Sequence, residues 1–214
     1  MDGGTVGNGL LEKDWTLKVG LALAEELRRR GHTVVLTREA DDTLPLMDRP
    51  AVVNAGAPVA LLSIHFNAGT PDAAGVETWY SWPKKPEIMA RLHDAAGLPM
   101  EGTLPDDGQH LAMAVQAAVQ ARTGARDRGI KNGMDLAMTS WTECPAVLIE
   151  CGFLSNATES RKIQEAAYRK KLVLGISDGY EAWLLLRQSA PVSAASMAPS
   201  ADAPEAEKVT DHKP

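Results

Sequence analysis

Apolar residues recur along this chain with two different periods, and the change from one period to the other predicts alternating helices and strands. One helix is predicted to begin with Asp14 as its N-cap and to end before Gly31, after three arginines that complement the helix dipole. Its apolar positions recur at helical spacing and are Leu17, Leu21, Ala24 and Leu27.

Short apolar runs rich in β-branched residues predict strands. These runs are residues 32–37, 60–67, 75–80 and 146–150, with 75–80 expected near an edge. Helical patterns occupy residues 50–54, where Pro50 suits a first turn, and residues 110–122 and 158–186. This order predicts an α/β fold in which helices flank a mostly parallel or mixed sheet.

Two segments depart from this pattern. Residues 83–108 are punctuated by Pro and Gly and are only weakly periodic, so they are interpreted as an inserted excursion, either a flap over a site or a surface loop. Beyond residue 187 the chain becomes rich in Ala, Pro and Ser. We therefore predict one domain over residues 1–187 and a disordered tail over residues 188–214.

Composition narrows the class of protein. With 214 residues, 44% of them hydrophobic, the chain can bury one sizeable core. A net charge of −6 argues against a nucleic-acid binder. No apolar stretch reaches the ~20 residues of a membrane helix, and no signal peptide is recognisable. Cys144 and Cys151 could form a disulfide or be two buried thiols.

Two predicted strands end in residues that can carry chemistry. The strand at 60–67 delivers His65 and then Asn67, and the strand at 146–150 delivers Glu150. A neutral imidazole is a good zinc ligand, and a buried carboxylate with a raised proton affinity suits a general base. The alternatives are a hydrogen-bonded core histidine and a structural salt bridge. Ends of parallel strands meet at one edge of a sheet, which favours a metal hydrolase.

Glu12 is a weaker candidate when taken alone. It belongs to a Glu-Lys-Asp triplet just before the predicted helix, where acidic residues commonly serve helix capping and the helix dipole. Its interpretation changes only when it is considered together with the other segments of the chain.

Six short segments occur in one order, and the ordered set is specific although each segment is short. They are Gly7-Asn-Gly-Leu-Leu-Glu12-Lys-Asp14, Leu36-Thr-Arg38, Arg49 with Ala-Val-Val-Asn54, Ser63-Ile-His65-Phe-Asn67, Asp127-Arg-Gly129 and Glu150-Cys-Gly-Phe-Leu-Ser-Asn156. Over residues 2–186 the chain resembles the zinc-dependent N-acetylmuramoyl-L-alanine amidases of the Amidase_3 family, which cleave peptidoglycan. The resemblance implies the family's phosphorylase/hydrolase-like fold.

The resemblance also implies roles for individual residues. Glu12 and His65 match two of the family's three zinc ligands, and Glu150 matches the catalytic glutamate. Arg128 lies in the family's Arg-Gly motif, where it could bind substrate or form a salt bridge that shapes the loop. Asn67 is a further substrate-binding candidate. The implied cofactor is Zn²⁺, the implied partners are peptidoglycan and muropeptides, and the implied location is the cell envelope. The sequence does not name a regulatory partner.

One departure from the family pattern concerns the first zinc ligand. In the family this ligand is a histidine at the end of the first strand, and Asp2-Gly3-Gly4 aligns just after that segment. The expected strand and its histidine are therefore missing from this chain. The remaining histidines, at positions 32, 93, 110 and 212, are poorly placed to replace it. With two ligands alone, we expect weak zinc binding and poor reactivity.

Two accounts explain the missing strand: the chain is a truncated form of a longer protein, or it is a short protein with an incomplete site. The second account raises an alternative function, a degenerate amidase domain that binds peptidoglycan or a partner without cutting it. A third interpretation, an unrelated α/β domain that binds a small molecule, is weakened because the early glycines follow no strand.

Overall fold

A four-stranded mixed sheet lies at the centre of the computed structural model, which describes residues 4–99 and 106–189. The strand order is β3–β6–β4–β5; β3 runs parallel to β6, β4 runs parallel to β5, and β4 runs antiparallel to β6. The strands are β3 (Leu61–Asn67), β4 (Val76–Tyr80), β5 (Asp127–Asn132) and β6 (Ala146–Phe153), with a small hairpin of β1 (Val6–Gly7) and β2 (Leu10–Leu11).

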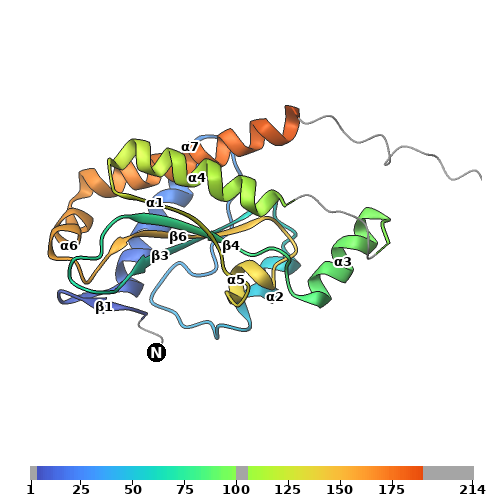
Figure 1. The fold of residues 1–214 in the computed structure, drawn as a ribbon, viewed down its shortest axis with the longest axis horizontal. Coiled ribbons are helices and arrows are strands. Elements are labelled where there is room, and N and C mark those ends of the chain that lie inside the picture. Colours follow the sequence, from blue (N-terminus) through green and yellow to red (C-terminus); the bar gives the residue numbers. More distant parts are fainter. Residues whose placement is uncertain (1–3, 100–105, 190–214) are drawn as a thin grey trace, which may run out of the picture.

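Helices flank this sheet on both sides. They are α1 (Glu12–Arg29), α2 (Arg49–Ala55), α3 (Pro86–Ala96), α4 (Asp107–Thr123), α5 (Ala137–Ser140), α6 (Ala157–Gln164) and α7 (Ala166–Ser189). In Figure 1, α4 and α7 lie above the sheet and the short helices α2 and α5 lie below it. The mixed sheet flanked by helices confirms the predicted fold class.

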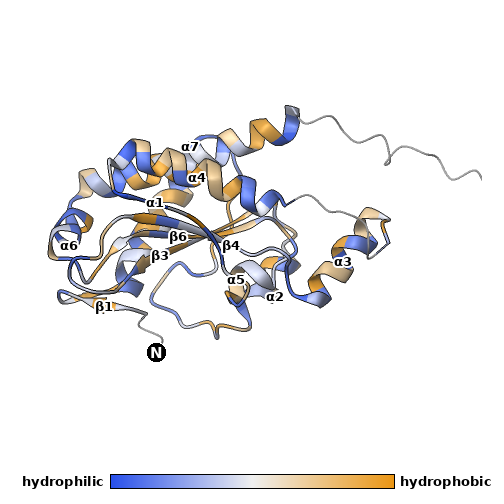
Figure 2. Cartoon of the chain, in the orientation of Figure 1, coloured by the Kyte–Doolittle hydropathy of each residue, from blue (hydrophilic) through white to orange (hydrophobic). Residues whose placement is uncertain are grey.

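The main hydrophobic core lies between the sheet and the long helices. It includes Ile149 and Phe66 from the strands and Leu111, Leu172 and Trp183 from α4 and α7, all at most 1% exposed. Along α4 and α7 hydrophobic and hydrophilic residues alternate, as Figure 2 shows. This alternation is expected for helices that bury one side against a sheet.

Helices α4 and α7 pack with almost no space between their backbones. A Cβ atom added at Gly179 would lie 2.5 Å from the Cα atom of Val115, and one added at Gly175 would lie 2.7 Å from the Cα atom of Val119. Only glycine at these two positions of α7 permits this approach.

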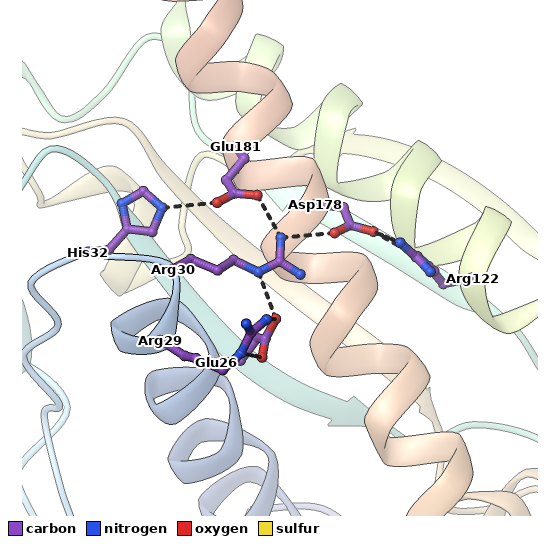
Figure 3. Close-up of polar contacts among 7 residues, drawn as sticks. All are labelled: Glu26, Arg29, Arg30, His32, Arg122, Asp178 and Glu181. Carbon is purple, nitrogen blue, oxygen red and sulfur yellow. Dashed lines mark hydrogen bonds and ion pairs between the residues drawn. The ribbon is translucent and has the colours of Figure 1, made fainter.

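An ion-pair network joins the end of α1 to α7 and α4 (Figure 3). Arg30, the residue after α1, contacts Glu26 of α1 and Asp178 and Glu181 of α7, and Arg122 of α4 contacts Asp178 from the other side. His32 lies 3.4 Å from Glu181 and edge-on to Tyr180. His32 therefore faces α7.

Several predicted element boundaries are wrong. The first helix begins at Glu12 rather than after Asp14, since the chain turns directly from β2 into α1. The strand at 75–80 lies near an edge, as predicted, but β5 covers it and forms the edge itself. Glu150 does not end its strand, since β6 continues to Phe153. By contrast, the short helix with Pro50 in its first turn is confirmed.

Residues 32–37 form no strand. Across the part of the chain that the structure describes, these residues join no ladder, and Val35 is 85% exposed. A strand needs a hydrogen-bonded neighbour, and a cavity separates this segment from β3, the nearest free sheet edge.

The predicted excursion at 83–108 contains α3 and, within its described part, runs on to the start of α4. Helix α7 continues to Ser189, two residues past the predicted domain boundary, and residues 190–214 of the predicted tail lie outside the described residues. Within residues 4–99 and 106–189, no helix is long and apolar enough to cross a membrane.

Candidate active site

His65, Glu150 and Glu77 lie side by side on three adjacent strands. Glu150 of β6 is in register with His65 of β3 on one side and with Glu77 of β4 on the other. Residues in register on neighbouring strands project from the same face at a spacing of about 5 Å. The next residue of β4, Thr78, donates a hydrogen bond to Gln116 of α4, so the row faces away from α4.

Glu12 reaches this row from the first turn of α1. Its Oε1 atom lies 2.9 Å from Nδ1 of His65 and accepts the Phe66 N–H at 3.2 Å, while Oε2 accepts the Thr5 N–H at 2.7 Å. Burial disfavours the charged carboxylate, but the hydrogen bonds from His65 and from the two backbone N–H groups outweigh burial and lower the pKa of Glu12.

The backbone near Gly4 fits closely around this carboxylate. Gly4 has a φ of +62°, and a Cβ atom there would lie 2.4 Å from Oε2 of Glu12. Glycine is thus required both by the left-handed conformation and by the approach of the Glu12 side chain. This contact accounts for one glycine of the glycine-rich start of the chain.

His65 remains partly accessible to solvent. Its side chain is 32% exposed, and its Nε2 atom lies 3.1 Å from the Ser63 hydroxyl, two residues earlier on the same face of β3. A cavity of about 200 Å³ opens beside His65 and Glu12. Its walls come from α1, β3 and residues 36–43.

Glu150 is a buried acid that lacks a partner. Its Oε2 atom has no hydrogen-bond partner among the described residues, and burial raises the pKa of Glu150 to about 7, with further contributions from Glu12 and Glu77. The predicted alternative, a salt bridge to an arginine, is not found for Glu150 in the described part of the chain. A carboxyl group with this pKa exchanges protons near neutral pH.

Arg128 and Asn67 meet at Glu77 rather than at Glu150. Arg128 Nε donates to Glu77 Oε2 at 2.6 Å, and Asn67 Nδ2 donates to Glu77 Oε1 at 3.1 Å. Lys131 Nζ also donates to Glu77 Oε2, at 2.5 Å. The predicted salt bridge of Arg128 is therefore present, and its acidic partner is Glu77.

The remaining polar candidates lie elsewhere. His93 is buried in α3 and His110 is exposed on α4. Among residues 4–99 and 106–189, no group of three His, Cys, Asp or Glu side chains is arranged to hold a metal ion. Cys144 and Cys151 are free, buried thiols.

Comparisons with known proteins identify the family of this chain. A family model described as N-acetylmuramoyl-L-alanine amidase (Amidase_3) matches residues 1–182. The chain belongs to this family. The Bacillus subtilis amidase LytC is 30% identical over 179 residues, which span 83% of this chain but 32% of LytC. An uncharacterised B. subtilis protein, YqiI, is 30% identical over 182 residues, or 85% of this chain and 79% of YqiI.

The fold of a solved amidase is similar too. The crystal structure of N-acetylmuramoyl-L-alanine amidase from Clostridium difficile 630 superposes with a TM-score of 0.72 at 31% identity, covering 85% of this chain and 89% of that chain. The chain is therefore a peptidoglycan hydrolase of the amidase family, as the ordered motifs of the sequence indicate.

The sequence did not single out two residues of this candidate site, Glu77 and Lys131. Alternation in residues 75–80 puts Glu77 and Trp79 on one face of their strand, and this was the available signal. The strand order, which sets Glu77 directly beside Glu150, could not be read from that alternation.

Proposed function

We propose that this chain hydrolyses the amide bond between N-acetylmuramic acid and L-alanine in peptidoglycan, with Glu150 as the general base. The observation that supports this proposal best is the buried, unpartnered Oε2 atom of Glu150, in register with the partly exposed His65. An acid of this kind, next to an accessible imidazole, can exchange a proton with a substrate on the open face of the sheet.

The donor atoms suit zinc in type but are few in number. Glu12 Oε1 and His65 Nδ1 converge to 2.9 Å, and a carboxylate oxygen and an imidazole nitrogen are ordinary zinc ligands. We propose that these two residues hold the ion. A tetrahedral site needs further ligands, and none joins them from the residues that the structure describes. Bound zinc polarises a substrate carbonyl and lowers the pKa of water.

We assign the proton transfer and the orientation of His65 to other residues of the chain. Glu150 accepts a proton from the attacking water and transfers it to the leaving amine as the C–N bond breaks, which yields a carboxylic acid and a free L-alanine amine. Ser63 orients the ring of His65 through its Nε2 atom. We further propose that the substrate is peptidoglycan or its muropeptides, and that the chain acts in the cell envelope.

Zinc uptake tests the metal part of this proposal. We expect zinc titrated into the chain to bind to the wild type and to His110→Ala, a control at an exposed histidine of α4, with equal affinity. His65→Ala and Glu12→Gln should lose this binding. Equal zinc affinity in all four proteins, or none in the wild type, would contradict the assignment.

A further inference from the structure

A cationic pair, Arg128 and Lys131, lies next to the row of His65, Glu150 and Glu77. Glu77 is 2% exposed, and its Oε2 atom accepts hydrogen bonds from both Arg128 and Lys131. Its Oε1 atom accepts hydrogen bonds from Asn67 and from the indole N–H of Trp79, each at 3.1 Å. We call these five residues the Glu77 cluster.

The charges of the Glu77 cluster do not cancel. Within these five residues one carboxylate faces two cations, an excess of one positive charge that the neighbouring Glu150 offsets only when it is ionised. Burial opposes ionisation of Glu77, but the hydrogen bonds from Lys131, Arg128 and Trp79 outweigh burial and lower the pKa of Glu77, so this carboxylate stays charged.

Both cations keep donors for a ligand. The side chains of Arg128 and Lys131 are 29% and 32% exposed. Glu77 takes only the Nε–H of Arg128, and no other acceptor for its guanidinium lies among the described residues. A guanidinium has five N–H donors and an ammonium has three, so most of these donors remain available.

Aromatic rings hold the two cations in place. The guanidinium of Arg128 lies 4.8 Å from the centre of the Phe153 ring, and the ammonium of Lys131 lies 4.9 Å from the centre of the Trp79 ring. With the Glu77 contacts, these rings fix both cations before a ligand arrives, which lowers the entropic cost of binding.

The position of Arg128 and Lys131 relative to Glu150 indicates which part of a substrate they would bind. Glu77 is in register with Glu150, one strand spacing or about 5 Å away. An extended peptide advances about 3.3 Å per residue, so a group bound by the pair lies one or two residues from the bond at Glu150. We propose that Arg128 and Lys131, positioned by Glu77, bind a carboxylate in the peptide leaving group of the substrate, so that the site selects acidic peptides.

This carboxylate-binding subsite of Arg128 and Lys131 rests on the proposed function. The experiment distinguishes a failure of the subsite from a failure of the proposed function. The probes are N-acetylmuramoyl-L-alanyl-D-glutamate and the same compound with its glutamate carboxylates converted to amides. Calorimetric titration into Glu150→Gln avoids turnover. We expect the acid to bind about tenfold more tightly than the amide, because charge-assisted hydrogen bonds are the stronger ones.

Further substitutions in the Glu150→Gln background locate that preference. Lys131→Gln should reduce it to less than about threefold, and Lys171→Gln, an equal change of charge on an exposed position of α7, should preserve it. Glu77→Gln should also weaken it while thermal unfolding shows a folded chain, since Glu77 acts by positioning the two cations.

The outcomes are distinct. Equal affinity for the acid and the amide, or a preference unchanged by Lys131→Gln, overturns the subsite and leaves the amidase proposal standing. Binding of neither compound overturns the proposed function itself.

Discussion

At the scale of single residues, the site depends on how the surroundings of three carboxyl groups shift their pKa values. Glu12 and Glu77 receive hydrogen bonds that keep them ionised, whereas Glu150 is buried with one unpartnered oxygen and its pKa rises to about 7. The roles that we propose for these three side chains differ accordingly: Glu12 is a ligand, Glu77 a positioning residue and Glu150 a base.

The raised pKa of Glu150 predicts a pH-dependent stability. The folded chain holds this proton more tightly than the unfolded chain, whose pKa is near the usual 4.5, so stability is lost as pH rises from about 4.5 to about 7. Glu150→Gln removes this dependence. Without metal, we expect the free energy of unfolding of Glu150→Gln, relative to that of the wild type, to increase by on the order of 2 kcal/mol from pH 5 to pH 8.

Urea unfolding of both proteins at several pH values measures this difference, in which the contributions of titrating groups remote from Glu150 cancel. A difference that stays constant across the range would show that Glu150 has an ordinary pKa in the folded chain.

The sequence identified Glu12, His65 and Glu150 as candidates because each stands next to an apolar run or within an ordered motif. It could not identify Glu77 as part of the site, since the role of Glu77 depends on a strand order that brings β4 next to β6. Arg128 was recognised, but its acidic partner lies 51 positions away in the chain.

At the scale of elements, α4 and α7 approach each other closely at two glycines of α7. We expect Gly179→Ala to destabilise the chain by about 1–3 kcal/mol, because its Cβ atom would meet the α4 backbone at 2.5 Å. Thermal or urea unfolding measures this loss.

Gly20→Ala in α1 is the matched control, since an added Cβ atom there has nothing within 4 Å. This change should stabilise the chain by up to about 1 kcal/mol through helix propensity. Similar effects of both substitutions would refute the close approach of α4 and α7.

Segment 32–37 shows where a local pattern fails. Its β-branched residues predict a strand, yet a strand forms only when a neighbouring edge lies within hydrogen-bonding distance. We expect the amides of residues 33–37 to exchange with deuterium rapidly, while those of β6, which lies between β3 and β4, exchange slowly. Exchange followed by mass spectrometry decides this, and protection of 33–37 equal to that of β6 would contradict the unpaired conformation.

At the scale of the whole molecule, the periodicity was sufficient to predict an α/β fold with helices on a mixed sheet. Membership of the amidase family agrees with that prediction over residues 1–182. The interior position of β4 and the antiparallel pairing of β4 with β6 depend on long-range contacts, so local patterns could not supply them. The same pairing places Glu77 and its cluster directly next to Glu150.

The central claim is that Glu150 is the base of a peptidoglycan amidase. The most direct measurement is the release of stem peptides with a new L-alanine amino terminus from purified peptidoglycan in the presence of zinc. We expect release by the wild type and by Glu165→Gln, an exposed control, and a loss of about 10²-fold or more in Glu150→Gln. Undiminished release by Glu150→Gln, or no release by the wild type, would contradict the account.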